Sequence, residues 1–381
     1  MSDKMVGIVT FNDAYNYGAF LQEYALQTYL IESGYRAEVI NYENPFFSQQ
    51  YLYSTNVVKK KGVKNKLKII YNFIFRHQLF LDRKTQKNNF MRAIEQEIKL
   101  SPSFSYYNKK WFNDTYNCFI AGSDQIWNVL VTNHDKFYFL DFVDNQSKKR
   151  TYAASLGRSS FDKSVLDEII SNIQGFDDIL IREESGKVLL AQAGIKSSVV
   201  LDPTFLLEKK DWMEFSKKST VKAPEKYILI YIVAAPTNLL DVAINYADKN
   251  RCDIIAWGGQ NRDIIHKGRR IKTIVSAGPY DFVKYIANAH KIFTTSFHGM
   301  ALAINLNVEF YYELCRAKYN NNARLETIAE KLELLDREIT DDGIVDAKVD
   351  WKKTNRILEQ LRVESREKLC RSIESSWQEQ E

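Results

Sequence analysis

VGIVTF (residues 6–11), NDAYNYG (12–18) and AEVINY (37–42) are the stretches that decide the fold of this 381-residue chain. The first is a short apolar run rich in β-branched residues, which favours a strand, and the second is a polar loop. Apolar residues then recur at helical spacing over residues 21–30, and Gly34 ends that pattern. AEVINY predicts a second strand. A strand, a loop, a helix and a strand in this order begin a parallel sheet covered by helices.

The same design recurs along the chain as apolar runs that end in polar residues. Four runs follow in the first half: NCFIAGSD (117–124), RTYAASLG (150–157), DDILIREES (177–185) and SSVVLDPT (197–204). Five follow in the second half: YILIYIVAA (227–235), CDIIAWGG (252–259), RIKTIV (270–275), KIFTTS (291–296) and VEFYYEL (308–314). Apolar strands that alternate with helices are typical of parallel sheets buried on both faces. We predict an α/β protein with two doubly wound, Rossmann-like halves that face a cleft.

The length of the chain exceeds what one hydrophobic core usually supports, so two domains are expected. The charged stretch 206–224, which contains a proline, is the predicted hinge. We predict an N-terminal domain over residues 1–207, with a basic helical insertion near 57–110, and a C-terminal domain over 208–345. Residues 346–381 are predicted to be helical and able to return to the N-terminal domain.

Composition is that of an ordinary globular protein, with 45% hydrophobic and 27% charged residues. The apolar runs fall short of the roughly 18 residues of a membrane-spanning helix, and the first one is too short for a secretory signal. We therefore expect a soluble, cytoplasmic protein. The four cysteines are too widely spaced for paired metal ligands. Buried reduced thiols are expected, with no metal and no cofactor.

The basic residues are unevenly distributed. Between Lys59 and Lys87 there are ten Lys or Arg residues and one acidic residue, Asp82, with IIYNFIF (69–75) in their midst. Interleaved apolar and cationic residues can lie on an anionic membrane surface, which would make the protein peripheral at the inner face of the cell membrane. A solvated helical hairpin explains the same residues. No recognised motif accompanies the charge, so we expect no nucleic-acid partner.

Candidate site residues are sought just after the apolar runs, because ligands of doubly wound sheets bind at the carboxyl ends of the strands. In the first loop, Asn16, Tyr17 and Gly18 lie at the start of the predicted helix. Gly18 lets a ligand approach the backbone, and free amides at a helix start favour an anion or a sugar hydroxyl. A tight turn that needs glycine is the alternative.

The run at 117–124 ends in Ser123 and Asp124. A carboxylate there can accept or steer the proton of a sugar hydroxyl, although either residue would also cap the next helix. Trp127 follows, and it could stack on a sugar ring, but a tryptophan in this setting more often fills core space. The run at 177–185 ends in Arg182, whose fork matches a carboxylate or a phosphate. A salt bridge to a neighbouring glutamate is the alternative.

TTSFHGMA (294–301) is the most informative stretch. A strand ends at Ser296, His298 follows, and Gly299 opens a helix whose amino end faces the same space. An imidazole, a hydroxyl and free amides together suit the binding of a phosphate and the transfer of a proton. Many lone histidines are structural, but this setting favours a functional one.

A polar, basic loop precedes the helix at 323–332. Asn322 and Arg324 lie at the start of that helix, and Arg316 and Lys318 lie upstream. These cations can add positive charge to the cleft, and a surface loop with an asparagine helix cap is the alternative. The chain contains none of the motifs of P-loop nucleotide-binding proteins, dinucleotide-binding dehydrogenases, zincins or serine hydrolases, which argues against those classes.

The chain resembles the polysaccharide pyruvyl transferase family through an ordered set of motifs that spans nearly its whole length: FNDAYNYGAFLQEYALQTYL (11–30), FIAGSDQIWN (119–128), RTYAASLG (150–157), IREESG (181–186), VVLDPTFLL (199–207), TTSFHGMALAINL (294–306) and NNARLETIAEKL (321–332). The resemblance implies a GT-B-like fold of two Rossmann-like domains, with the acceptor on the N-terminal side and the donor on the C-terminal side. It implies that phosphoenolpyruvate is the donor substrate and that a pyruvate ketal forms on a hexose of a capsule, exopolysaccharide or cell-wall glycan, or on its lipid-linked oligosaccharide precursor.

The resemblance also implies catalytic roles for His298, Asp124 and Arg182. Some members carry arginine two residues before the histidine, where this chain has Ser296. Arg316, Lys318 and Arg324 are the candidates to replace that arginine. Two other functions stay open: a glycosyltransferase that uses a nucleotide sugar, because a two-domain cleft suits either donor, and a non-catalytic sugar-binding relative.

Overall fold

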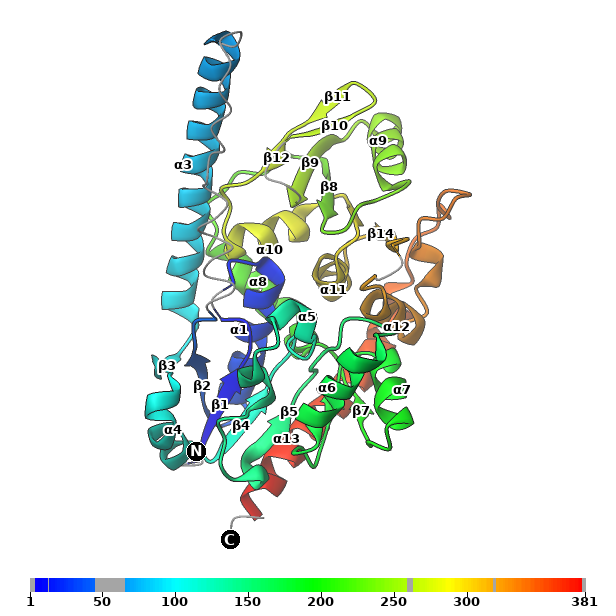
Figure 1. The fold of residues 1–381 in the computed structure, drawn as a ribbon. Coiled ribbons are helices and arrows are strands. Elements are labelled where there is room, and N and C mark those ends of the chain that lie inside the picture. The colour runs from blue at the N-terminus through cyan, green and yellow to red at the C-terminus, as the bar shows by residue number, and fades with distance from the viewer. Residues whose placement is uncertain (1–3, 13, 45–65, 259–262, 318–319, 379–381) are drawn as a thin grey trace.

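The structure, a computed structural model, describes residues 4–12, 14–44, 66–258, 263–317 and 320–378. Two parallel five-stranded sheets dominate these residues, one in each half of the chain. In Figure 1 the first sheet lies in the lower part of the molecule and the second in the upper part, with helices around both. The predicted α/β architecture with two doubly wound, GT-B-like halves is confirmed.

The first sheet has the order β3-β2-β1-β4-β5. Its strands are β1 (Met5–Val9), β2 (Arg36–Asn41), β3 (Leu100–Ser103), β4 (Cys118–Ala121) and β5 (Lys149–Thr151). Val6 pairs with Ala37 of β2 on one side and with Cys118 of β4 on the other. The winding therefore reverses between β1 and β4, and this switch point is where doubly wound sheets bind ligands.

The second sheet repeats the same winding, with the order β12-β9-β8-β13-β14. Its strands are β8 (Tyr227–Ile232), β9 (Asp253–Gly258), β12 (Thr273–Ile274), β13 (Lys291–Thr294) and β14 (Phe310–Tyr312). Its switch point lies between β8 and β13, which pair through Leu229 and Ile292. Both sheets thus place a switch point on the side where the two halves of the chain meet.

The predicted single strand RIKTIV is split in the structure. Its first part belongs to an antiparallel hairpin of β10 (Ile264–His266) and β11 (Arg269–Ile271), and its second part is β12 of the main sheet. Lys267 and Gly268 form the hairpin turn with φ of +46° and +81°. Two successive residues with positive φ are the requirement of a tight two-residue hairpin turn, which an apolar run does not reveal.

Two short strands extend the first sheet beyond β5. They are β6 (Leu180–Ile181) and β7 (Ser198–Val199), which pair in parallel. An isolated parallel bridge joins Ala154 to Ile181, and the amide of Arg182 donates to the carbonyl oxygen of Ala154 at 3.1 Å. The residues that follow β4, β6 and β7 therefore lie at the same edge.

The α-helices of the described residues are α1 (Tyr17–Glu32), α3 (Lys66–Glu97), α4 (Lys109–Thr115), α5 (Val129–Thr132), α6 (Lys163–Ile173), α7 (Glu184–Gln192), α8 (Lys209–Lys217), α9 (Leu239–Asn250), α10 (Pro279–Asn288), α11 (Phe297–Leu306), α12 (Ala323–Lys331) and α13 (Trp351–Gln378). Helix α13 runs back along the first sheet, where the Nε atom of Arg150 donates to the carbonyl oxygen of Ser372 at 2.8 Å.

The domain limits themselves stay a prediction. Within the described ranges, no helix has the length and apolar character needed to cross a bilayer.

Helix α3 contains the described part of the predicted basic region, whose residues 59–65 lie outside the described ranges. Figure 1 shows it as a long helix along the side of the molecule, with its amino end projecting past both sheets. Its carboxyl-terminal part packs on the core through the buried residues Phe90 and Ala93. The strand that follows, β3, joins the first sheet inside the stretch predicted as an insertion.

Candidate functional site

A cavity of about 370 Å³ lies between the two halves of the chain. This volume falls in the range of small-molecule sites. Six of the residues predicted from the sequence line it: Asn16, Asp124, Ser296, His298, Asn322 and Arg324. The first two follow β1 and β4 of the first sheet, and Ser296 and His298 follow β13 of the second. The cavity therefore takes residues from the switch points of both sheets.

Three helices begin at this cavity. Asn16, Ser296 and Asn322 are the N-cap residues of α1, α11 and α12, and all three line the cavity. The Asn16 side chain accepts from the amide of Gly18 at 2.8 Å, and the Ser296 hydroxyl accepts from the amide of Gly299 at 3.4 Å. Helix starts carry partial positive charge and unsatisfied amides. Their convergence favours an anionic ligand.

A buried ion pair lies beside the cavity. Arg182, which follows β6, donates from Nη1 to Asp202 Oδ2 at 2.7 Å and to Ser123 Oγ at 3.3 Å. Ser123 in turn donates to the same carboxylate oxygen at 2.9 Å. Burial alone would lower the pKa of Arg182 and raise that of Asp202, but their mutual attraction outweighs burial. The pKa of Arg182 is raised, and that of Asp202 is held at about 2.

Asp124 lies between two guanidinium groups. Its Oδ1 atom is 3.6 Å from Arg182 Nη2 and 3.9 Å from Arg324 Nη1, and it accepts from the amide of Gln125 at 2.9 Å. The backbone of Asp124 has φ of +72°, a left-handed conformation that costs a non-glycine residue roughly 1–2 kcal/mol. The fold thus holds this carboxylate at the cavity wall in a strained position.

Arg324 is the cation that a ligand can reach most readily. It lines the cavity, its Nε atom has no hydrogen-bond partner among the described residues, and its guanidinium lies 5.8 Å from the Phe297 ring. The guanidinium of Arg182 lies 5.0 Å from the same ring. Burial and the charge of Arg182 lower the pKa of Arg324 to about 10, so it stays protonated near neutral pH.

His298 stands in the first turn of α11, packed against the start of α1. A Cβ atom added to Gly18 would lie only 2.0 Å from His298 Nδ1, so glycine is needed for the close approach of these two helices. The other ring nitrogen, Nε2, is 3.8 Å from Asp202 Oδ2. Burial lowers the pKa of His298, and Asp202 and Asp124 act in the opposite direction. The imidazole is therefore a buried base beside two carboxylates.

Comparisons with known proteins were made for the whole chain. A model of the polysaccharide pyruvyl transferase family matches residues 16–312. The chain belongs to this family. No curated protein matches it at a significant level.

Some solved structures resemble this pyruvyl transferase family member in the overall course of the backbone only. UDP-GlcNAc 2-epimerase from Methanocaldococcus jannaschii is 14% identical, with a TM-score of 0.48 over 93% of this chain and 92% of that one. The corresponding enzyme from Neisseria meningitidis, bound to UDP-GlcNAc, is 11% identical, with a TM-score of 0.47 over 94% and 90%. Arabidopsis thaliana UGT89C1 complexed with quercetin is 12% identical, with a TM-score of 0.41 over 98% and 94%. No functional statement rests on these likenesses.

The remaining predicted residues of this family member that the structure describes do not line the cavity. Tyr17 packs between aromatic rings and donates to the carbonyl oxygen of Ala277 at 2.8 Å, which ties α1 to the second half of the chain. Arg316 is exposed and pairs with Asp341. Lys318 lies outside the described residues. Gly299 is buried in the first turn of α11. Of the candidates to replace the family arginine, the structure brings Arg324 to the cavity.

Trp127 is part of the hydrophobic core and does not line the cavity. Its ring is fully buried and stacks on Phe139 at 6.0 Å, and its Nε1 atom donates to the carbonyl oxygen of Tyr138. A tryptophan inside an apolar cluster is more often part of the core than a sugar platform. The sequence already favours the core, and the burial of the ring agrees with that interpretation.

Of the residues that contact the charged groups of the site, Asp202, Glu183 and Phe297 were not predicted, and neither were cavity-lining residues such as Gln125 and Thr295. Asp202 follows the apolar run at 197–204 just as Asp124 and Arg182 follow theirs, so the strand-end rule could have found it. Glu183 is fully buried, and its Oε1 atom accepts from the amides of Leu156 and Gly157 at 2.8 and 3.1 Å. A phenylalanine beside a histidine carries no such signal in the sequence.

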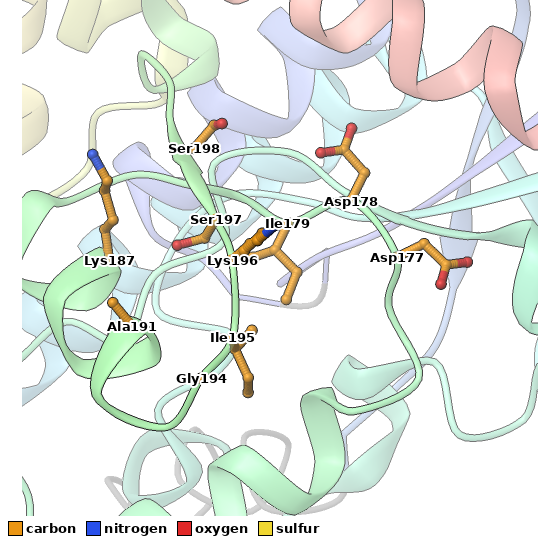
Figure 2. A pocket seen from close by; sticks show the side chains of 10 residues that line it. All are labelled: Asp177, Asp178, Ile179, Lys187, Ala191, Gly194, Ile195, Lys196, Ser197 and Ser198. Carbon is orange, nitrogen blue, oxygen red and sulfur yellow. The ribbon is translucent and has the colours of Figure 1, made fainter.

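A second hollow of about 550 Å³ lies at the opposite end of β6 and β7 (Figure 2). Residues 177–179 and 194–198 line it, and these precede or begin the two strands, whereas Arg182 and Asp202 follow them. Figure 2 shows the carboxylates of Asp177 and Asp178 well apart from Lys187, so its charges do not converge. In the described part of the chain, no group of three or more His, Cys, Asp or Glu residues is arranged to hold a metal ion.

Proposed function

We propose that this family member transfers the enolpyruvyl-derived group of phosphoenolpyruvate to two hydroxyls of one hexose, forming a pyruvate ketal and releasing phosphate. The observation that carries the proposal is the convergence of three helix starts, Arg324 and His298 on one cavity. Phosphoenolpyruvate carries a phosphate and a carboxylate, and both groups suit guanidinium and helix-start donors. Membership of the polysaccharide pyruvyl transferase family supports the same reaction.

The donor lies with its anionic groups against Arg324 and the first turn of α11. Arg324 lines the cavity and has its nearest carboxylate at 3.9 Å, whereas Arg182 is already paired to Asp202 at 2.7 Å. An anion gains more from the guanidinium that is less neutralised. Arg182 therefore acts without contacting the donor. It adds positive charge to the site and holds its neighbouring side chains in place.

The chemistry starts with a proton added to the methylene carbon of phosphoenolpyruvate, which makes the adjacent carbon electrophilic. One sugar hydroxyl attacks that carbon, and Asp124 takes or steers the hydroxyl proton. The C–O bond to phosphate then breaks, and protonated His298 stabilises the departing phosphate. A second hydroxyl of the same sugar closes the ketal and gives up its proton. One donor and one acceptor thus yield one ketal and one phosphate.

The acceptor is a sugar of a cell-surface polysaccharide or of its lipid-linked precursor. Phosphoenolpyruvate has ten non-hydrogen atoms, and the cavity, at about 370 Å³, is of a size that holds drug-like ligands. Room for part of a hexose therefore remains beside the donor. Gln125, Thr295 and Asn321 border that space and are uncharged, which suits the hydroxyls of a neutral sugar.

The assay that tests the proposal offers phosphoenolpyruvate with galactoside and mannoside acceptors. We expect phosphate release that depends on the acceptor, together with a new ketal methyl signal in the NMR spectrum of the product. In a parallel assay, UDP- and GDP-sugars replace phosphoenolpyruvate, and the acceptors are the same. Consumption of a nucleotide sugar while phosphoenolpyruvate is inert would identify a glycosyltransferase. Acceptor binding without turnover of any donor would identify a non-catalytic sugar-binding protein.

We also propose that α3 rests on an anionic membrane surface, where lipid-linked sugars are presented. Phe80, Leu81 and Met91 of α3 are 56%, 40% and 42% exposed. Exposed apolar residues on a basic helix are typical of interfacial helices. Figure 1 shows the amino end of this helix projecting past both sheets.

Replacement of Phe80 and Leu81 by serine is expected to weaken sedimentation with phosphatidylglycerol vesicles by at least about fivefold, because two apolar side chains no longer enter the bilayer. Val188→Ser on α7 is the control, since Val188 is equally exposed at 55% but lies on another surface. Equal binding of the double variant and the wild type, or no binding by either, would rule out this contact.

A further inference from the structure

Asp202 is the most buried acid of the site and has no part in the proposed chemistry. It follows β7 and is the N-cap of a short 3-10 helix, η4 (Pro203–Phe205). Its side chain is fully buried, and it does not line the main cavity. A buried carboxylate is costly unless it is paired and hydrogen-bonded, so its partners indicate why it is there.

The two oxygens of the Asp202 carboxylate have different partners. Oδ1 accepts from the amide of Thr204 at 3.0 Å and from its hydroxyl at 2.7 Å. These bonds fix the plane of the carboxylate. Oδ2 then points at Arg182, at 2.7 Å, with His298 Nε2 at 3.8 Å. Ser123 donates to the same oxygen at 2.9 Å. One oxygen thus anchors the group, and the other faces the site.

The backbone that carries Asp202 is held from several sides. The carbonyl oxygen of Thr204 accepts from Trp212 Nε1 at 3.1 Å and from Asn305 Nδ2 at 2.9 Å. The carbonyl oxygen of Phe205 accepts from Arg362 Nε at 2.6 Å. These donors come from α8, α11 and α13, so the segment is fixed to both halves of the chain. A carboxylate on such a support can hold other side chains in place.

We propose that Asp202 is a positioning residue, whose Oδ2 atom fixes Arg182 and gives His298 a partner when that imidazole is protonated. The proposal rests on the proposed function only in placing His298 at the departing phosphate. Its geometry is that of a carboxylate that orients a histidine, as in catalytic triads, although at 3.8 Å the two groups attract through charge and not through a hydrogen bond.

The charged groups that face His298 determine the sign of the expected effect. They come from four elements: Asp202 from η4, Asp124 from the loop after β4, Arg182 from the residue after β6, and Arg324 from α12. Burial and the two arginines disfavour the imidazolium, and the two carboxylates favour it. Removal of the Asp202 charge therefore lowers the pKa of His298 further. As the pH rises, a catalytic step that needs protonated His298 therefore fails at a lower pH in this variant than in the wild type.

The test replaces Asp202 by asparagine, which keeps an oxygen for Thr204 and removes the charge. NMR titration of the imidazole resonances is practical because the chain has five histidines, and a His298 variant assigns the signal. We expect the His298 midpoint to move to lower pH in Asp202→Asn, and kcat to fall by at least about tenfold. The high-pH limb of the rate profile moves in the same direction. An unchanged His298 midpoint overturns the proposal.

A matched control separates this effect from general damage. Asp241 pairs with His266 at 2.7 Å in the second half of the chain, away from the cavity. Asp241→Asn is expected to leave the midpoint of His298 and kcat unchanged. The titration needs no substrate, so it distinguishes failure of this proposal from inert phosphoenolpyruvate, which would be failure of the proposed function.

Thr204→Ala keeps the test decisive should Asp202→Asn fail to fold. This variant keeps the charge of Asp202 and removes one of the two bonds that fix its plane. We expect kcat to fall severalfold, because orientation is lost, while the His298 midpoint stays close to that of the wild type. A Thr204→Ala protein with wild-type kcat would show that the orientation of Asp202 is irrelevant, which contradicts a positioning role.

Discussion

Replacing His298 by alanine is expected to reduce turnover of phosphoenolpyruvate by at least about a thousandfold and to leave the melting temperature nearly unchanged. A positioned acid or base contributes about 10²- to 10⁴-fold, and His298 also carries charge toward the departing phosphate. Stability changes little, because Nε2 has no hydrogen-bond partner among the described residues and the ring borders a cavity that water can enter.

Phosphate release measures the turnover, and calorimetry measures the melting temperature. Together the two measurements check this expectation. His266→Ala is the control, because it removes a second histidine that also faces a carboxylate, Asp241, but lies on the β10–β11 hairpin. Added imidazole is expected to restore part of the activity of His298→Ala by entering the space left open. Retention of wild-type turnover in His298→Ala would remove this residue from the mechanism.

Replacing Gly18 by alanine is expected to reduce kcat by about a hundredfold or more, although it removes no reacting group. The new Cβ atom would lie 2.0 Å from His298 Nδ1 and 2.6 Å from two further atoms of the ring. Such distances force the imidazole away from its position, and a displacement of about 1 Å can cost about 10²-fold in rate. The free energy of unfolding is expected to fall by about 1–3 kcal/mol, as in other overpacked cores.

A double-mutant cycle tests whether the new methyl group acts through the His298 ring. In Gly18→Ala combined with His298→Ala, the ring that the methyl group meets is gone, so the loss of stability is expected to be largely restored. Gly175→Ala is the control, because a Cβ atom there meets its nearest neighbour at 3.7 Å, an ordinary contact. If Gly18→Ala destabilises the protein equally in the presence and absence of the His298 ring, the two helices do not meet as described.

Much of the fold followed from sequence patterns because the buried strands are local signals. Each apolar run that ended in polar residues became a strand of a parallel sheet or of its extension, and the hairpin at Lys267 and Gly268 is the exception. That exception arises because backbone φ at a turn is not visible in hydropathy. The residues after the runs were also found by rule, since the carboxyl ends of parallel strands lie together.

What the sequence could not supply is the direction of a side chain once its strand has ended. Tyr17 and Gly18 are neighbours in the same predicted loop, yet Tyr17 joins the aromatic core with Phe282 and Gly18 lies against His298. One step along a helix turns a side chain by about 100°, so adjacent residues serve different surfaces. Arg316 and Arg324 were equal candidates in the sequence, and of these two only Arg324 lines the cavity.

The order of residues by itself determined the two doubly wound sheets, the family and the segments that end at the cleft, because these depend on short-range periodicity and on the order of motifs. Only the tertiary structure decided which of those segments meet. The pairing of Asp202 with Arg182 arises from the parallel pairing of β6 with β7. The contact of His298 with Gly18, across 280 positions of the chain, arises from the packing of one half of the molecule on the other. No local pattern encodes such a contact, because it exists only when both halves are folded.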